Sequence, residues 1–398
     1  SLNVPSDAGT LIFSFVGIQP QEVAIRGRSQ INVALEPSIE EMEEVVVMGY
    51  TTKGKNQITG STVQVESEEL EDVPVLSVDQ ALQGKVAGFN ISTSSGTPGA
   101  VQDIRIRGVG SILASNQPLF VIDGVPVVNS NFSGSGDRSS LSALSRLNNN
   151  DIESITVLKD ASATSAYGAR GSNGVIVITT KSGRKGQTEF NFSAYRGFQN
   201  RAIDGYDVLT GAEREELLLE AVYNTYGESY DFSRGEAFDF ADTYGLLPSA
   251  YYGWVDAGRP NAQWDKNLKK ENAPTTNFSL SASGGDETSQ FYASLGYNAT
   301  DAVIKGSSFK RINASLNYTR NLSDVVKFST SNTVSNARQD GLMLEQGAFF
   351  ANPMMGKYFM SSWYQPYNEL GEPNTNTGSL YNWLYLKDHD VTHNDMLR

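Results

Sequence analysis

The chain has 398 residues, of which 39% are hydrophobic, and its formal net charge is −14. The absence of cysteine excludes disulfide frameworks, thiolate zinc sites and cysteine nucleophiles, and the negative charge argues against binding to nucleic-acid backbones. No segment approaches the roughly 18 consecutive apolar residues of a membrane-spanning helix, but membrane strands alternate apolar and polar residues and give no such signal.

Residues 1–37 predict the C-terminal part of a small β-sandwich. Short strand patterns occur at Thr10–Gly17, Glu22–Gly27 and Ile31–Glu36, and Pro37 ends the series. The chain opens in a strand and not in a signal peptide, so we expect its natural N-terminus to lie upstream.

Residues 38–50 differ in character from what precedes them. A glutamate-rich stretch at 40–44 comes before the apolar run Val45–Met48. An extended apolar strand behind a solvated acidic leader can add to the sheet edge of a partner protein. An ordinary edge strand of the preceding domain is the alternative, and the local sequence favours neither.

Residues 51–185 predict a compact α/β domain. Ser77 and Gln80 form a capping box that predicts a short helix, and a second short helix is expected to end near Gly168. Four strand-like runs lie at Asp103–Gly108, Leu119–Pro126, Glu153–Asp160 and Gly174–Lys181. The pair Asp123–Gly124 predicts a tight turn within the second of these runs.

From residue 186 onward the pattern becomes strict alternation. Phe190, Phe192 and Ala194 share one face of a predicted strand, and neutral polar residues occupy the other face. Four further segments repeat the pattern, and a sixth strand is expected near Asp395. The predicted strands have about 9–11 residues, the length of a tilted membrane strand. A soluble β-sheet domain also alternates, and it is the alternative at this point.

Two long loops interrupt the strands, at about 198–275 and 339–388. Thr210 and Glu213 form a capping box for a helix that is expected to reach about Val222. Tyrosine and tryptophan rings can stack on sugars and can also hold peptide side chains. The candidate substrate contacts are therefore aromatic residues of the second loop, Trp363, Tyr364, Tyr367, Tyr381 and Trp383. Loop packing or a membrane-interface girdle is the alternative role for each ring.

The inventory of reactive residues favours no enzyme class. The sequence has no GxSxG, HExxH or P-loop motif, so we expect no enzymatic activity and no cofactor. The two histidines, His389 and His393, would lie about 13 Å apart on a strand, which is too far to share a metal ion.

Six motifs follow one another along the chain. They are EEVVVMGY at Glu43–Tyr50, ALQGKVAGFNI at Ala81–Ile91, SGTPG at Ser95–Gly99, IRIRG at Ile104–Gly108, PLFVIDGVP at Pro118–Pro126, and a long run at Asp151–Gly183 that begins DIESITVLKD. This ordered series resembles the SusC-like (SusC/RagA) family of TonB-dependent outer-membrane transporters. The strand segment Pro274–Gly306 is also similar, and the resemblance is weakest in the two long loops.

The resemblance implies a mostly β fold with four parts. Residues 1–37 would end a carboxypeptidase-regulatory-like β-sandwich, 38–50 would hold the TonB box, and 51–185 would be an α/β plug domain. Residues 186–398 would supply the first strands and extracellular loops of an antiparallel transmembrane barrel of about 22 strands. Because five or six strands leave unpaired backbone groups in lipid, we expect an incomplete barrel.

The resemblance also implies roles for particular residues. The expected TonB box consists of Glu44, Val45, Val46, Val47, Met48, Gly49 and Tyr50. Arg105 and Arg107 alternate with isoleucines, so both are expected on one face of a plug strand. Together with Arg170 they are expected to contact carboxylates of the barrel wall. Structural ion pairs without a gating role are the alternative.

The function that the resemblance implies is active import of oligomeric nutrients across the bacterial outer membrane. The expected partners are a SusD-like surface lipoprotein acting as a lid, TonB with its ExbB and ExbD motor proteins, outer-membrane lipid, and an oligosaccharide or oligopeptide substrate. A siderophore- or cobalamin-type receptor, and a surface-binding protein that transports nothing, are the alternatives.

Overall fold

The computed structural model describes residues 10–15, 18–25, 33, 45–48, 51–54, 61–70, 75–93, 96–112, 115–127, 141–203, 205–323, 325–342, 353–375, 377, 382–389 and 391–397. The chain divides into two compact units. The first unit holds the antiparallel pair β1 (Thr10–Phe15) and β2 (Ile18–Ala24). The strands β3 (Val45–Met48) and β4 (Thr51–Gly54) form a two-stranded sheet.

The second unit begins with an α/β domain that is built on a five-stranded sheet. The strand order is β5-β10-β11-β8-β9, and only the pair β8 and β11 runs parallel. The strands are β5 (Thr62–Glu66), β8 (Leu119–Ile122), β9 (Val125–Val127), β10 (Ile152–Leu158) and β11 (Val175–Thr180). Strand β10, which lies between β5 and β11, is almost fully buried, and its residues Ile152, Ile155 and Val157 belong to the main core of the domain.

Shorter elements complete this domain. A second sheet pairs β6 (Phe89–Thr93) with β7 (Gln102–Ile106). The helices are α1 (Val78–Ala81) and α2 (Ala161–Thr164), and the 3₁₀ turns are η2 (Ser67–Glu69), η3 (Ala143–Arg146), η4 (Asn149–Asp151) and η5 (Ser165–Gly171).

Two local predictions for the α/β domain had different outcomes. Asp123 and Gly124 both have positive φ, 47° and 82°, so the predicted tight turn joins β8 to β9. The capping box at Ser77 is wrong, because the Ser77 side chain makes no cap hydrogen bond to α1 and is buried instead.

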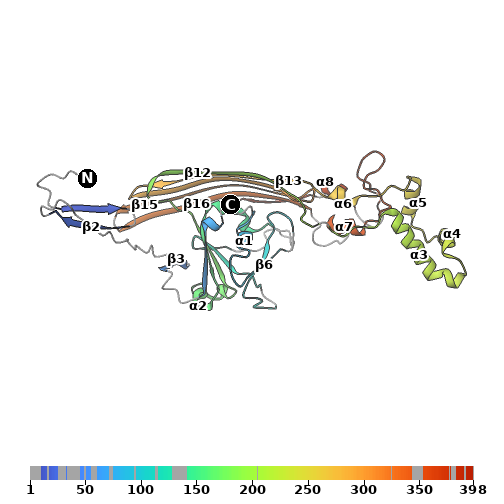
Figure 1. Cartoon of the computed structure of the whole chain (residues 1–398), viewed down its shortest axis with the longest axis horizontal. Coiled ribbons are helices and arrows are strands. Elements are labelled where there is room, and N and C mark those ends of the chain that lie inside the picture. Colours follow the sequence, from blue (N-terminus) through green and yellow to red (C-terminus); the bar gives the residue numbers. More distant parts are fainter. Residues whose placement is uncertain are drawn as a thin grey trace. The chain divides into compact units, whose positions relative to one another are not determined.

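The long sheet consists of six antiparallel strands in sequence order (Figure 1). They are β12 (Gly186–Gln199), β13 (Ala273–Gly285), β14 (Ser289–Asp301), β15 (Ser308–Ser323), β16 (Val326–Leu342) and β17 (Val391–Leu397). The first five strands have 13 to 17 residues, which is longer than predicted. Pairing continues beyond the apolar band into polar ends such as Arg320–Ser323, where alternation gives no signal.

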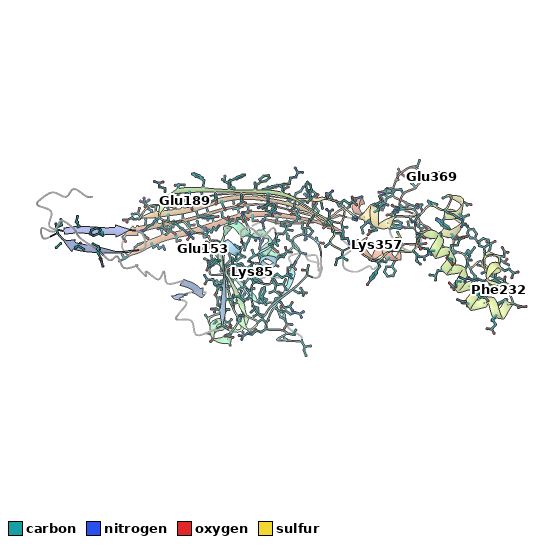
Figure 2. The ribbon with its side chains drawn as sticks, viewed as in Figure 1. Lys85, Glu153, Glu189, Phe232, Lys357 and Glu369 are labelled. Carbon is teal, nitrogen blue, oxygen red and sulfur yellow. The ribbon has the colours of Figure 1, made fainter. Side chains whose placement is uncertain are left out.

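The two faces of the long sheet carry opposite kinds of side chain. One face exposes large apolar residues, including Phe190 (74%), Phe192 (70%), Leu295 (60%) and Ile312 (62%). The other face buries neutral polar residues, including Asn277, Ser279, Asn298, Asn313 and Ser335. Figure 2 shows side chains on the two sides of the strands. A soluble sandwich would bury its apolar face, so this arrangement is that of a wall with lipid outside and polar contents inside.

Helices fill the two long loops. The first loop holds α3 (Gly211–Tyr230), η6 (Arg234–Glu236), α4 (Ala237–Thr243), α5 (Ser249–Asp256) and α6 (Trp264–Leu268), and the second holds α7 (Pro353–Phe359) and α8 (Trp383–His389). Both loops leave the same end of the long sheet, since Gln199 pairs with Ala273 and Leu342 with Val391 (Figure 1).

The predicted capping box of Thr210 and Glu213 is confirmed, but α3 continues to Tyr230 and not to about Val222. Its last turns carry Tyr226 and Tyr230, whose rings pack against Phe240. Among the described residues, no helix is both long enough and apolar enough to span a membrane.

Candidate functional site

A buried carboxylate of the α/β domain enters a group of hydroxyl and amide side chains on the long sheet. Asp151, at the end of η4, is 6% exposed. Its Oδ1 accepts a hydrogen bond from the Tyr292 hydroxyl at 2.9 Å, and its Oδ2 accepts from Asn313 Nδ2 at 3.1 Å and Ser315 Oγ at 3.3 Å. Burial raises the pKa of the Asp151 carboxyl above its ordinary value, although these hydroxyl donors act in the opposite direction.

A buried arginine of the long sheet contacts the α/β domain in the opposite direction. Arg311 projects from β15 into the α/β domain and is 4% exposed. Its Nη1 donates to the carbonyl oxygens of Ser145 at 2.7 Å and Leu76 at 3.3 Å, and also to that of Leu147. Its positive charge favours the ionised form of Asp151. Each side of the interface therefore buries one charge among polar atoms of the other side.

Neutral hydrogen bonds continue the interface on both sides of this charged pair. Ser335 Oγ on β16 donates to Arg146 O at 3.1 Å, and Gln339 Nε2 donates to Pro98 O at 2.9 Å. Asn317 Nδ2 on β15 donates to Lys181 O at 2.6 Å. The domain and the sheet are thus joined mainly through polar atoms.

Two glycines allow the domain and the sheet to approach closely. A Cβ on Gly296 of β14 would lie 2.4 Å from Asn313 Oδ1 and 2.8 Å from Asn148 Nδ2. A Cβ on Gly99, whose φ is +80°, would lie 2.7 Å from the buried ring of Phe309. Larger residues at these positions would separate the two surfaces.

The comparisons with known proteins agree with this arrangement. Residues 54–175 match the TonB-dependent receptor plug domain. The chain is 35% identical over 371 residues to TonB-dependent receptor P26 of Formosa agariphila, a match that covers 92% of this chain and 34% of that protein. It is 37% identical over 308 residues to TonB-dependent receptor SusC of Bacteroides thetaiotaomicron, covering 77% of this chain and 27% of that protein.

A solved structure of the RagAB peptide transporter has the same fold over 83% of this chain and 37% of its own, with 29% identity and a TM-score of 0.65. The chain belongs to the SusC/RagA-like family of TonB-dependent outer-membrane transporters. Its α/β domain is the plug, and its long sheet is part of the barrel wall in the bacterial outer membrane. The chain spans about a third of the length of the curated relatives that it matches.

The expected TonB box lies mostly within the described residues. Val45–Met48 forms β3, which pairs with β4 in a two-stranded sheet ahead of the plug. Glu44, Gly49 and Tyr50 lie outside the described residues. A strand in a two-stranded sheet has one edge that its partner does not cover, and the role of β3 as a TonB box stays a prediction.

The expected plug arginines do not share one strand face. Arg105 is exposed on β7, but that strand ends at Ile106 and Arg107 has a φ of 61°. The left-handed conformation turns Arg107 away from the alternation, and it forms an ion pair with Asp160 inside the plug. An ion pair of this kind is the alternative role that the sequence left open for Arg107. The expected wall contacts of Arg105, of Arg107 and of Arg170, which is exposed on η5, stay predictions.

Among the described residues, Asp151 and Arg311 make charged contacts between plug and wall, and the sequence motifs did not indicate them. A signal for Arg311 was present in the sequence, because it is the charged residue in the inward-facing series that continues through Asn313, Ser315 and Asn317. No comparable signal marked Asp151, since only the fold shows that it lies on the plug surface facing the wall.

Two of the candidate substrate residues are buried and so do not offer their rings to a ligand. Trp363 is 5% exposed and donates from Nε1 to Gly211 O at 3.0 Å, and Trp383 is 3% exposed. Tyr364 packs against the same cluster as Trp383, whereas Tyr367 is 40% exposed. Tyr381 lies outside the described residues. The two tryptophans pack the loops together, which was the alternative role.

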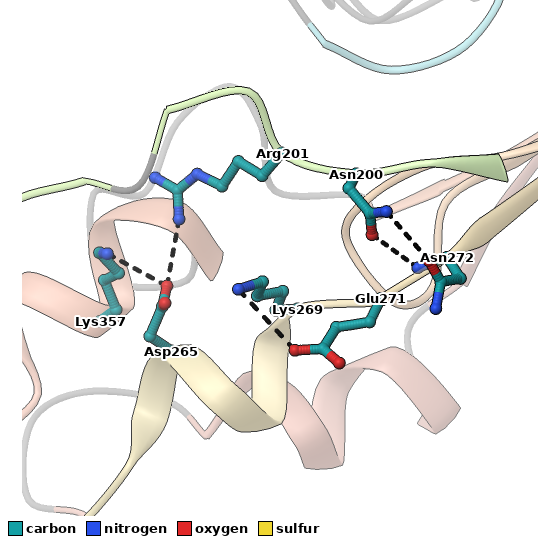
Figure 3. A network of polar contacts seen from close by, with 7 residues as sticks. All are labelled: Asn200, Arg201, Asp265, Lys269, Glu271, Asn272 and Lys357. Carbon is teal, nitrogen blue, oxygen red and sulfur yellow. Dashed lines mark hydrogen bonds and ion pairs between the residues drawn. The ribbon is translucent and has the colours of Figure 1, made fainter.

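Ionic contacts also join the two loops. Asp265 of α6 accepts hydrogen bonds from Arg201 Nη1 at 3.2 Å and from Lys357 Nζ of α7 at 3.1 Å (Figure 3). Nearby, Asn200 and Asn272 bind each other across the base of the first loop (Figure 3). The loops therefore form one connected platform at one end of the long sheet.

Among the described residues, no three or more His, Asp or Glu side chains are grouped so that they could hold a metal ion. We expected the two histidines on one strand, but His389 ends the helix α8 and His393 lies in the strand β17.

Proposed function

We propose that the protein imports oligomeric nutrients across the outer membrane with energy delivered through TonB. The observation that carries the proposal is the polar contact between plug and wall. Asp151, Arg311, Ser335 and Gln339 join the two through hydrogen bonds that water can replace when the surfaces part. A plug held in this way can be displaced and reseated, whereas a plug fused to the wall by an apolar core would not return readily.

The segment Glu44–Tyr50 is the proposed point at which TonB pulls. Val45–Met48 is extended and lies ahead of the first plug strand, β5. Strand addition uses main-chain hydrogen bonds, which resist a pull along the strand because they act together. Force applied there would reach the plug directly through the chain.

The proposed cargo is a glycan fragment or an oligopeptide, and the proposed partner is a SusD-like lipoprotein that closes the barrel from outside. The likeness to the RagAB peptide transporter supports the peptide alternative. The connected loop platform supports a lid, because a partner that opens and closes needs a fixed surface to move against.

The test uses proline in the proposed TonB box. Proline removes one backbone N–H, and alternate N–H groups of a strand point to opposite edges. One of the variants Val46→Pro and Val47→Pro should therefore abolish uptake, whereas Val46→Ala and Val47→Ala should keep it. Uptake is followed in cells with a fluorescent oligosaccharide mixture and, separately, with a fluorescent casein peptide digest.

Deletion of Glu44–Tyr50 is the stronger form of the same test. It should abolish uptake while membrane insertion and binding of the probes at the cell surface stay intact. Uptake that survives the deletion would show that the pull does not act through this segment.

A further inference from the structure

Two basic side chains of the loop platform share a single carboxylate. Lys357 Nζ lies 3.1 Å and Arg201 Nη1 lies 3.2 Å from the same oxygen, Asp265 Oδ1 (Figure 3). Lys357 is 4% exposed, and the side chain of Arg201 is 17% exposed. The neighbouring pair drawn in Figure 3, Lys269 and Glu271, balances its own charge at 3.9 Å. At neutral pH the group of Arg201, Lys357 and Asp265 therefore carries one net positive charge.

Three donor atoms in this group surround one point beside Gly205. A Cβ built on Gly205 would lie 3.0 Å from both Arg201 Nη2 and Lys357 Nζ, and closer still to the Tyr358 hydroxyl. Because glycine has no side chain, it places no atom of its own at this point. The ring of Tyr358 also contacts Lys357, whose Nζ is 4.7 Å from the ring centroid. The tips of the three side chains are thus held around a space of the size of a Cβ.

Two of these donors are unused within the described part of the chain. There, Arg201 Nη2 and the Tyr358 hydroxyl have no hydrogen-bond acceptor, although Arg201 Nη1 has Asp265. Tyr358 is 37% exposed and Gly205 is half-buried, so a group from solvent can reach the point between them. An anionic oxygen there would satisfy both donors and would also complete the neutralisation of the buried Lys357, which is unfavourable while its carboxylate is shared.

The space beside Gly205 fits a carboxylate better than a bulkier anion. It is no larger than a Cβ would need, so only the tip of a flat group can enter it. A carboxylate presents one oxygen to the space, and the planar guanidinium of Arg201 meets carboxylate oxygens in its own plane. A tetrahedral phosphate or sulfate would press its further oxygens against the same side chains.

We propose that Arg201, Lys357 and Tyr358 form a binding site for a carboxylate group of the cargo. This inference rests on the proposed function and adds to it that the cargo is acidic. Outer-membrane barrels place their long loops on the outer side, where cargo arrives. Two sources share this chemistry, the C-terminal carboxylate of an oligopeptide and the carboxylate of a uronic-acid sugar, and the experiment tests them separately.

The test compares probes that differ only in the charge of a carboxylate. One pair is N-acetylated tetraalanine with a free C-terminus and the same peptide with a C-terminal amide. The other pair is trigalacturonate and its full methyl ester. Isothermal titration calorimetry of the purified protein measures the affinity for each probe. We expect the acid member of at least one pair to bind about tenfold more tightly than its neutral partner, because it gains hydrogen bonds from charged donors.

Two conservative variants test the geometry of the site. Tyr358→Phe removes only the hydroxyl and should weaken binding of the acid probe several-fold, and Tyr244→Phe, at an exposed ring of the same platform, is its control. Gly205→Ala fills the point with a methyl group and should also weaken the acid probe. Its control is Gly253→Ala, since a Cβ at Gly253 would meet nothing within 4 Å. Neither control should change the preference for the acid probe.

A third variant tests the charge of the site. Lys357→Met should abolish the preference for the acid probe. Lys266→Met removes the same charge from an exposed position on α6, next to Asp265, and should keep the preference. Should Lys357→Met fail to fold, Tyr358→Phe and Gly205→Ala still decide the matter, because neither of them removes a charge.

Equal affinities of the acid and neutral probes in both pairs would overturn the site, and so would an equal loss of preference in Lys266→Met and Lys357→Met. If the deletion of Glu44–Tyr50 still abolishes uptake in that case, the proposed function stands without the site. Acid-selective binding together with uptake that survives the deletion would support the site and overturn the coupling through Glu44–Tyr50. A preference in the peptide pair alone identifies a peptide cargo, and a preference in the sugar pair alone identifies a uronic-acid glycan.

Discussion

The contact between plug and wall and the contact between the two long loops both join distant parts of the chain, but by different chemistry. The plug meets the wall through Asp151, Arg311 and neutral hydrogen bonds. The loops meet through rings, with Trp363 packed 5.4 Å from Tyr251 and 6.2 Å from Trp254. Water can replace the first kind of contact, whereas separating the second exposes large apolar surfaces.

This difference suggests that one interface opens and the other stays fixed. The cluster of rings that joins the loops also buries a hydrogen-bonded hydroxyl group. Tyr251 donates from its hydroxyl to Glu215, and burial together with this bond raises the pKa of Tyr251 to about 12. Figure 2 labels Phe232, which packs against this cluster in the first loop, and Lys357 of α7 in the second loop. Three substitutions test whether the two interfaces differ in this way.

The largest effect is expected for Arg311→Met. It removes the donor to three plug carbonyls and leaves the Asp151 carboxylate buried without its cation, so the plug should lose about 3–5 kcal/mol of stability. Calorimetry of the purified protein would measure this as a lower temperature for the plug transition. Arg320→Met, at the exposed end of the same strand, is the control and should change little. An equal effect of the two variants would contradict the role given to Arg311.

Trp363→Ala is expected to cause a loss of stability of similar size that is confined to the loop platform. The buried ring packs between the two loops and binds Gly211 O, so its removal should cost about 3–5 kcal/mol within the platform. Hydrogen exchange of α3 should accelerate while that of the plug strand β10 stays unchanged. Tyr367→Ala, at a 40% exposed ring of the same loop, is the control. Faster exchange in β10 would show that the two interfaces are not independent.

Asp151→Asn is expected to have the smallest effect on the stability of the plug, and this effect should depend on pH. Burial raises the pKa of Asp151 in the folded plug above the unfolded value of 3.8, so the folded state binds the proton more tightly. The stabilising contribution of the protonated carboxyl is present at low pH and is lost as the pH rises through the folded-state pKa. Asparagine does not titrate. The plug transition temperature of the native protein minus that of the variant should therefore fall as the pH rises from about 4 to 7. A constant difference would mean that Asp151 is not buried as described.

The sequence predicted the architecture well because that architecture depends on local patterns. Alternation of apolar and neutral polar residues located the strands from β12 to β16, and the ordered motifs located the plug strands. The residues at which helices and strands end were less predictable. Strand β15 continues through Arg320–Ser323, because backbone pairing with β16 does not require an apolar face.

The amino-acid sequence was enough to establish the family, the order of plug and wall, and which face of each wall strand is apolar. The residues that join plug to wall became known only from the folded chain. Arg107 leaves its strand through a left-handed backbone conformation, whereas Asp151 and Tyr292, 141 positions apart, meet at 2.9 Å. Likewise, Trp363 is buried because helices of the other loop pack over it. Periodicity follows from a few neighbouring residues, but a contact between distant segments depends on how the whole chain folds.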